Sequence, residues 1–161
     1  MMGDEEYRKI RDYALKLLTI RPRSVYEIRS KLQLFLKRKK LQNKYSEKVI
    51  NSLKENNFLN DGEFAKWWCQ QRYEFRPKGK KALSYELISK GIDQEIIDRI
   101  LSKTTRNMEL ELAKKVLIKK LILWGKLPEL IRKKKISDYL FRRGFSTEII
   151  YIVIDESCEK T

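Results

Sequence analysis

The fold is decided by the stretch Arg143-Gly144-Phe145-Ser146-Thr147-Glu148-Ile149-Ile150, because the chain uses this pattern more than once. The same pattern is present in Lys90-Gly91-Ile92-Asp93-Gln94-Glu95-Ile96-Ile97, and a fainter copy, Tyr45-Ser46-Glu47-Lys48-Val49-Ile50, precedes both. A pattern that returns roughly every 50 residues is typical of one helical unit repeated along a chain.

Each position of the pattern has a physical role in turning the chain from one helix into the next. Gly91 and Gly144 can take the left-handed backbone conformation that closes a helix without a Cβ clash. Two residues later a short side chain with an oxygen atom, Asp93, Ser146 or Ser46, is expected to cap the first amides of the following helix. The pattern therefore predicts a helix, a tight turn and a second helix at each copy.

The helix signals divide the chain into three expected repeats, residues 1–59, 60–106 and 107–161. Strand signals are weak, since β-branched residues fall at helical spacing and Asp61-Gly62 is better explained as a helix start than as a hairpin turn. We therefore predict an all-α protein built from three tandem three-helix repeats.

Individual helix ends are marked by proline and by capping residues. Pro22 ends the first helix, and Ser24 opens the second with a capping box. Asn60 caps the first helix of the second repeat in the same way. Residues 37–44 are strongly basic and are expected to form an exposed linker. The apolar side chains expected on the buried side of the helix after Asn60 are Phe64, Trp68 and Phe75.

The composition favours an acidic partner. Lys and Arg outnumber Asp and Glu by 37 to 22 in 161 residues, which gives a net charge of +15 with no His. Such an excess suits nucleic acid, an anionic membrane or an acidic protein surface, although it also promotes solubility. No apolar run reaches the ~20 residues that span a bilayer, and two cysteines without a leader predict a soluble, cytoplasmic protein without disulfides.

The residue types that enzymes use are missing or scattered. Without His the commonest general base and metal ligand is absent, and Cys69 and Cys158 match no zinc pattern. The six glycines are scattered, so no phosphate-binding loop is present. We therefore expect no catalytic residue, no metal site and no cofactor.

The basic residues are grouped at matching places in successive repeats, beside the first turn and along the second helix. If the repeats stack regularly, these groups merge into one basic stripe that suits a phosphate backbone or an acidic groove. The alternative for any single group is an ordinary solvated face. The cations that we expect to contact a partner are Arg21, Arg23, Arg76, Lys78, Lys80, Lys81, Arg142 and Arg143.

Two other binding modes deserve comparison with this one. Helix-turn-helix proteins use a similar turn to read DNA bases, but Glu95, Asp98 and Glu148 put acidic groups where approach to phosphates needs cations. A general DNA-binding protein that contacts only the phosphate backbone stays an alternative. The basic amphipathic segment 113–124 suits a membrane surface less well, because the third repeat needs its apolar face.

The chain resembles the RecX family of regulatory proteins, which bind and modulate the RecA recombinase. The matching residues are Tyr13-Ala14-Leu15, Arg21-Pro22-Arg23-Ser24, Glu27, Leu32, Leu59, Asp61, Phe64-Ala65, Glu86-Leu87, Lys90-Gly91-Ile92 and Tyr139-Leu140-Phe141-Arg142-Arg143-Gly144-Phe145. They span nearly the whole chain, and the closing Arg-Arg-Gly-Phe is the most specific of them.

The resemblance implies a non-enzymatic regulator with an elongated, curved array of three-helix repeats. Such a protein lodges in the groove of a RecA filament on single- or double-stranded DNA, and mainly inhibits ATP hydrolysis, filament growth and recombination. We expect it to act as a monomer and without a membrane. The basic insertion at 36–44 and the long connection at 122–135 exceed the family pattern, so partner contacts near them transfer least well.

Overall fold

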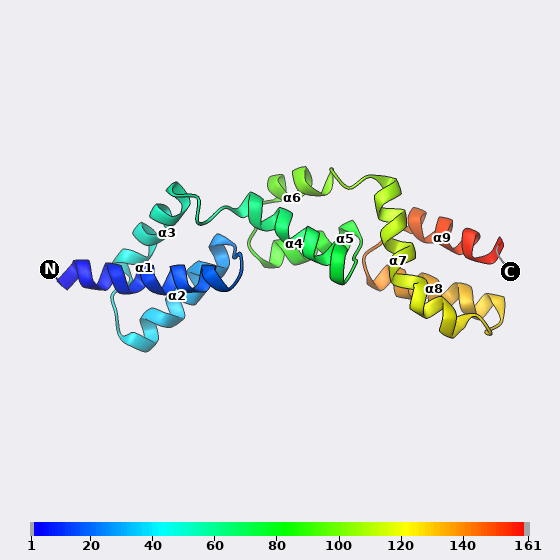
Figure 1. Ribbon diagram of the computed structural model, residues 1–161, viewed down its shortest axis with the longest axis horizontal. Coiled ribbons are helices and arrows are strands. Elements are labelled where there is room, and N and C mark those ends of the chain that lie inside the picture. The colour runs from blue at the N-terminus through cyan, green and yellow to red at the C-terminus, as the bar shows by residue number, and fades with distance from the viewer. Residues whose placement is uncertain (1, 160–161) are drawn as a thin grey trace. The chain divides into compact units, whose positions relative to one another are not determined.

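The computed structural model describes the backbone of residues 2–159 and the side chains of residues 3–157, and within these it contains α-helices and no strand (Figure 1). The all-α prediction is therefore confirmed, and the helices form three successive triplets. The helices are α1 (Met2–Ile20), α2 (Val25–Lys39), α3 (Ser46–Glu55), α4 (Asp61–Phe75), α5 (Lys80–Ser89), α6 (Gln94–Leu101), α7 (Arg106–Trp124), α8 (Glu129–Arg142) and α9 (Thr147–Glu159), with a 3₁₀ turn at Asn43–Tyr45.

The chain folds as two compact units that do not follow the triplet boundaries. Unit 1 comprises residues 1–67 and 88–96, and unit 2 comprises residues 68–87 and 97–161. Unit 1 therefore contains the first triplet, and unit 2 contains the third. The second triplet, α4–α6, contributes residues to both units.

The first triplet buries its apolar side chains among α1, α2 and α3. Ser24 caps α2 by accepting a hydrogen bond from the Glu27 amide, and Glu27 accepts in return from the Ser24 amide, so the predicted capping box is present. Helix α1 ends at Ile20, two residues before Pro22, as predicted. The buried core residues are Ile10, Ala14, Ile28, Leu32, Leu36, Val49, Ile50, Leu53 and Leu59.

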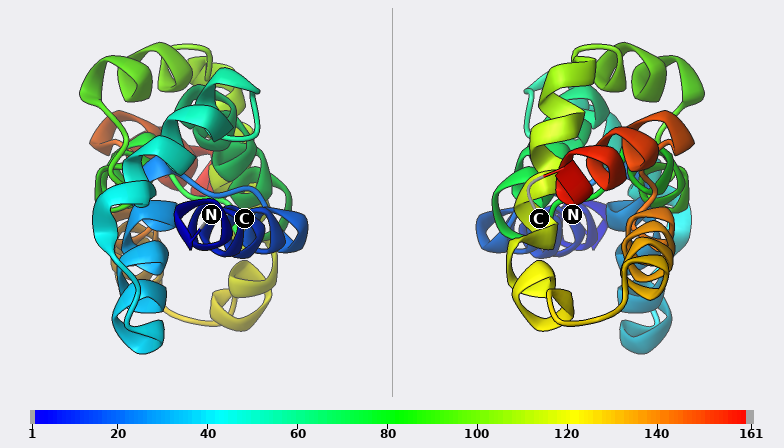
Figure 2. Two further views of the ribbon diagram at one scale, coloured as in Figure 1. Left: turned by 90° about the vertical axis from the view of Figure 1, so that its left-hand side faces the viewer. Right: turned by 90° about the vertical axis from the view of Figure 1, so that its right-hand side faces the viewer.

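The third triplet packs α8 and α9 on one side of the long helix α7, and the right-hand view of Figure 2 shows these helices together in yellow, orange and red. Its core contains Ala113 and Leu117 from α7. Helix α7 also carries Ile118 and Ile122, which are 60% and 77% exposed. The apolar residues of α7 are therefore not confined to its buried face.

The repeated turns have the backbone that the sequence predicts. Gly91 and Gly144 have φ of +72° and +81°, and Lys40 takes a similar left-handed conformation, φ +54°, at the end of α2. The expected cap at Ser46 is wrong. Ser46 is the first residue of α3, directly after the 3₁₀ turn at Asn43–Tyr45, and its hydroxyl donates to the Asn43 side-chain oxygen instead of accepting from an amide of α3.

In unit 1 the turn between α5 and α6 joins the start of α2. The Ser24 hydroxyl donates to the Lys90 carbonyl oxygen at 2.7 Å, and the Asp61 carboxylate accepts from the Val25 amide at 2.9 Å. Only glycine fits at Gly91, because an added Cβ would overlap the Tyr26 side chain as well as strain the backbone. We call this contact the first joint.

In unit 2 the turn between α8 and α9 joins the start of α5 in the same way. The Gly79 amide donates to the Arg143 carbonyl oxygen at 2.8 Å, and the Lys81 amide donates to that of Gly144 at 3.2 Å. The Glu109 carboxylate lies 3.4 Å from the Lys80 amide. This second joint shows that the repeated sequence pattern serves to connect one triplet to the preceding one.

Candidate partner-binding surface

Two of the predicted contact residues in unit 1 are used inside the protein. Arg21 forms an ion pair with Glu27 at 2.8 Å, and Lys90 pairs with the same carboxylate at 3.0 Å. Burial opposes the ionised form of Glu27, but the hydrogen bonds from Arg21, Lys90 and the Ser24 amide outweigh it and lower the pKa of Glu27 to about 2. The guanidinium of Arg23 donates to the Leu17 carbonyl oxygen near the end of α1. Arg21 and Arg23 therefore stabilise unit 1.

Glu86 plays a corresponding role on α5 in unit 2. It accepts hydrogen bonds from Lys78, from Arg72 at 2.9 Å and from the Trp68 indole at 2.8 Å. Burial opposes ionisation here too, but these donors lower the pKa of Glu86. Lys78, another predicted contact residue, is thus held by an internal partner.

Arg143 and Arg76 are brought together by the second joint. The Arg143 guanidinium donates to the Pro77 carbonyl oxygen at 3.2 Å and lies 5.0 Å from the centre of the Tyr139 ring. Arg76 is exposed and forms no ion pair with any residue that the structure describes. Both line a hollow of about 430 Å³, which we call the basic hollow. Its lining residues are Glu74, Phe75, Arg76, Pro77, Lys115, Val116, Ile118, Lys119, Lys120, Tyr139 and Arg143.

The basic hollow combines positive charge with exposed apolar side chains. Its only carboxylate is Glu74, against five Lys and Arg side chains. Phe75 at its edge is 74% exposed, so the prediction that Phe75 is buried is wrong. The reason is that Phe75 is the last residue of α4, where Lys115 reaches across to the Tyr73 and Glu74 carbonyl oxygens and fixes the helix end. Such a hollow suits an acidic group that is flanked by an apolar surface.

The other predicted cations of unit 2 lie near Phe141. Lys81 stands 5.7 Å from the centre of the Phe141 ring, and that ring is 62% exposed. Arg142 is exposed and Lys80 is half-buried, and neither forms an ion pair within the described part of the chain. We define the outward basic surface of unit 2 as Phe75, Arg76, Lys80, Lys81, Lys119, Lys120, Phe141 and Arg142.

Sequence reasoning missed part of this surface. Lys119 and Lys120 interrupt an apolar run of α7 and are not among the cations expected to contact a partner, and Phe75 is expected to be buried because an apolar residue in a helix usually is. The signal available was position: Phe75 directly precedes Arg76-Pro77, and Phe141 directly precedes Arg142. Residues beside helix ends have fewer neighbours to cover them.

Among residues 3–157 no group of acidic, His or Cys side chains has the arrangement of a metal site. No helix in the described chain is long and apolar enough to cross a bilayer. Burial, with a contribution from Glu86, raises the pKa of the Cys69 thiol to about 11, so this side chain is held as an unreactive thiol.

Comparison with known proteins identifies the repeats. Residues 60–101 match the model of the second three-helix domain of RecX, and residues 107–154 match that of the third. A protein named regulatory protein RecX from Clostridium acetobutylicum is 32% identical over 160 residues, which cover 97% of this chain and 72% of that protein. Its namesake from Amycolatopsis mediterranei is 29% identical over 153 residues, covering 95% and 85% respectively.

Solved structures agree with these matches. The crystal structure of RecX from Lactobacillus salivarius is 25% identical and has a TM-score of 0.83, with 96% of this chain and 97% of that chain covered. A second crystal structure, of a regulatory protein RecX, is 24% identical and has the same fold with a TM-score of 0.82, covering 96% and 75%. Because two domain models cover more than half of the sequence and a relative over 30% identical aligns along nearly all of it, this chain belongs to the RecX family of regulatory proteins.

Proposed function

We propose that this protein binds the RecA nucleoprotein filament in the cytoplasm and inhibits ATP hydrolysis, filament growth and recombination. Its relatives are named regulatory proteins, which agrees with such a role. The observation that carries the proposal is the outward basic surface of unit 2, whose cations form no ion pair within the described part of the chain and which includes two exposed phenyl rings. We further propose that residues 1–59, 60–106 and 107–161 are the three repeats that supply the contacts.

The chemistry of this surface is binding rather than bond breaking. Exposed Arg and Lys attract carboxylates or phosphates over a Debye length, about 8 Å at physiological salt. The rings of Phe75 and Phe141 lose water when a partner covers them, which adds an apolar contribution that is independent of salt. Of the cations expected from the sequence, we retain Arg76, Lys80, Lys81 and Arg142 as partner contacts. Arg21, Arg23, Lys78 and Arg143 act indirectly, by holding the joints and helices in place.

The experiment is to measure ATP hydrolysis by RecA on single-stranded DNA while this protein is added at much less than one molecule per recombinase. Strong inhibition at such ratios means that few molecules act on a whole filament. The variant Arg76→Glu with Arg142→Glu should need a several-fold higher concentration for half inhibition. Arg99→Glu with Lys103→Glu is the matched control, because both residues are exposed cations of unit 2 outside this surface.

The same cations also favour the alternative, a protein that binds DNA phosphates without the recombinase. In that case inhibition requires enough protein to coat the DNA. Binding to DNA alone should then be as tight as binding to the filament, and it should weaken steeply as salt increases. Inhibition that tracks DNA coverage at every salt concentration would refute the recombinase proposal.

A further inference from the structure

The basic hollow has walls of three chemical kinds, and together they restrict what can bind there. Its lining comes from the end of α4 with the turn that follows, from the middle of α7, and from Tyr139 and Arg143 at the end of α8. All of these segments belong to unit 2. The volume of about 430 Å³ is at the lower end of the ~300–1,000 Å³ that is typical of ligand sites, so the hollow has room for a few side chains.

The first kind of wall is cationic, and part of it is held in place. The Lys115 ammonium donates to the Tyr73 and Glu74 carbonyl oxygens, both at 3.2 Å. Arg143 is held in the same way by the Pro77 carbonyl oxygen. Carbonyl groups carry no net charge, so the positive charges of these two side chains stay available to attract an anion.

The other cations of this wall keep their hydrogen-bond donors. Arg76 and Lys119 are exposed and form no ion pair with any residue that the structure describes. Lys120 stands 5.7 Å from the centre of the Tyr139 ring. Free guanidinium and ammonium groups bind carboxylates and phosphates alike. The cationic wall by itself therefore does not distinguish an acidic protein from DNA.

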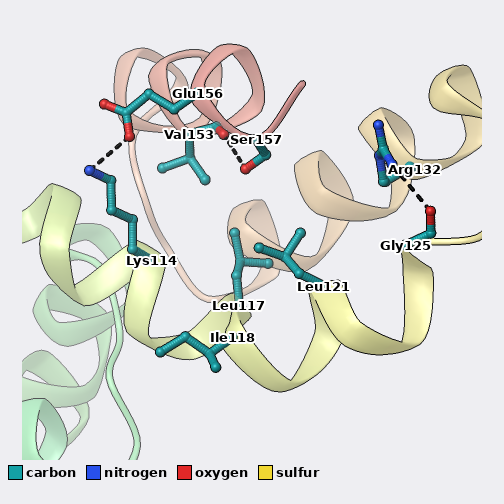
Figure 3. Close-up of a pocket in the computed structure, with 9 residues that line it drawn as sticks. All are labelled: Lys114, Leu117, Ile118, Leu121, Gly125, Arg132, Val153, Glu156 and Ser157. Carbon is teal, nitrogen blue, oxygen red and sulfur yellow. Dashed lines mark hydrogen bonds and ion pairs between the residues drawn. The ribbon is translucent and has the colours of Figure 1, made fainter. Parts of the chain in front are cut away.

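A second hollow of unit 2, between α7 and α9, lacks this free charge. Its volume is similar, about 380 Å³, and apolar side chains such as Leu117 line it. Figure 3 shows that its Lys114 is paired with Glu156, at 2.7 Å, and that its Arg132 donates to the Gly125 carbonyl oxygen. An acidic ligand would have to break the ion pair to bind there. The basic hollow needs no such exchange.

The second kind of wall in the basic hollow is apolar. Phe75 and Ile118 are exposed on it, and Val116 is half-buried beside them. A nucleobase can stack on the ring of Phe75, but the aliphatic side chains offer it no ring face. An aliphatic side chain of a ligand would instead cover this wall and remove apolar surface from water.

The third kind of wall accepts hydrogen bonds. The Glu74 carboxylate lines the hollow, and Gln70 donates to one of its oxygens at 3.2 Å. Helix α4 ends at Phe75, so the negative end of the helix dipole lies at the same place. A phosphodiester group has only acceptor oxygens and is repelled by these groups. A peptide has backbone amides that can donate to them.

We infer that the basic hollow binds a short segment of a partner protein in which a carboxylate side chain stands beside an aliphatic one. The carboxylate binds Arg76 and Lys119. The aliphatic side chain covers Ile118, and a backbone amide donates to Glu74. A DNA phosphate matches only the cationic wall. The inference deepens the proposed function and rests on it for one point, that the recombinase supplies this segment.

The experiment is a fluorescence-anisotropy titration of the full chain with a labelled peptide, acetyl-Gly-Ser-Glu-Leu-Asp-Leu-Glu-Ser-Gly-amide. A dissociation constant on the order of 100 µM is expected, because such a segment covers much less than a standard interface. A peptide with Ser in place of both Leu residues should bind about fivefold more weakly. A labelled oligothymidylate of equal charge should also bind more weakly than the Leu peptide.

One pair of variants tests the cationic wall. Arg76→Ala with Lys119→Ala should weaken binding of the Leu peptide about tenfold, since two exposed ion pairs are lost. Arg99→Ala with Lys103→Ala is the matched control, because it removes two exposed cations of unit 2 that do not line the hollow. The control should bind the peptide like the parent chain.

A second pair of variants tests the apolar wall. Ile118→Ser should weaken binding of the Leu peptide about fivefold and leave binding of the Ser peptide unchanged. Ile122→Ser is the control, because Ile122 is even more exposed on the same helix and does not line the hollow. Circular dichroism of all four variants should match that of the parent chain, since every altered side chain is exposed.

The inference is overturned if the Leu peptide does not bind up to about 1 mM, if the Ser peptide or the oligothymidylate binds as tightly, or if the control variants lose as much binding. Failure of the proposed function has a different result: the parent chain does not inhibit ATP hydrolysis by RecA, although the peptide titration still succeeds. If Ile118→Ser loses the peptide but inhibits RecA like the parent chain, the recombinase is refuted as the source of the segment.

Discussion

Replacing Glu27 by Gln should destabilise unit 1 near neutral pH and have little effect in strong acid. Gln keeps the size of the side chain and still accepts the Ser24 amide in the capping box. It removes the negative charge that holds Arg21 and Lys90. The side chain of Glu27 is only 12% exposed, so water replaces these partners poorly.

The magnitude follows from the pKa of Glu27, which is lowered from 4.5 to about 2. Each pKa unit corresponds to about 1.36 kcal/mol, so ionised Glu27 contributes about 3 kcal/mol. Because the pKa of this carboxyl is lower in the folded chain than in the unfolded chain, its ionisation stabilises the folded state. The contribution is fully present above the unfolded pKa of 4.5 and is lost as the pH falls from there towards 2.

The assay is urea unfolding of the parent chain and of Glu27→Gln at pH 7 and at about pH 2, followed by circular dichroism. The difference in unfolding free energy should be about 3 kcal/mol at pH 7 and close to zero at the acid end. Glu55→Gln, an exposed carboxylate without an ion pair within the described residues, is the control and should change little at either pH. A difference that is the same at both pH values would refute the electrostatic explanation and indicate altered packing instead.

The other predictions concern the turns, the thiol and the two kinds of cation. Gly144→Ala should destabilise unit 2 by at least about 2 kcal/mol in thermal unfolding, from backbone strain and overlap with α5, whereas Lys40→Gly should stabilise unit 1 by about 1 kcal/mol. In a variant that keeps only Cys69, the thiol should resist alkylation at pH 8 until the protein unfolds, because its pKa is about 11. Lys78→Glu should lower the melting temperature by several degrees, and Arg142→Glu should leave it unchanged while weakening filament binding.

The family was identified from the sequence because its motifs are local and ordered. Two of these motifs are turns, Arg142-Arg143-Gly144-Phe145 and Arg21-Pro22-Arg23-Ser24. The conformation of each turn depends on only a few neighbouring residues. The domain matches at 60–101 and 107–154 confirm that identification.

The sequence by itself determined the helices, the repeated turns and the positive charge, because periodicity, capping and left-handed glycines act within a few residues of one another. It failed at Ser46 and Phe75, where a 3₁₀ turn and a helix end changed the local surroundings. Only the tertiary structure decided which cations face outward. The carboxylate that binds Lys90 is Glu27, 63 residues away, and contacts at that separation depend on how one triplet packs on the next.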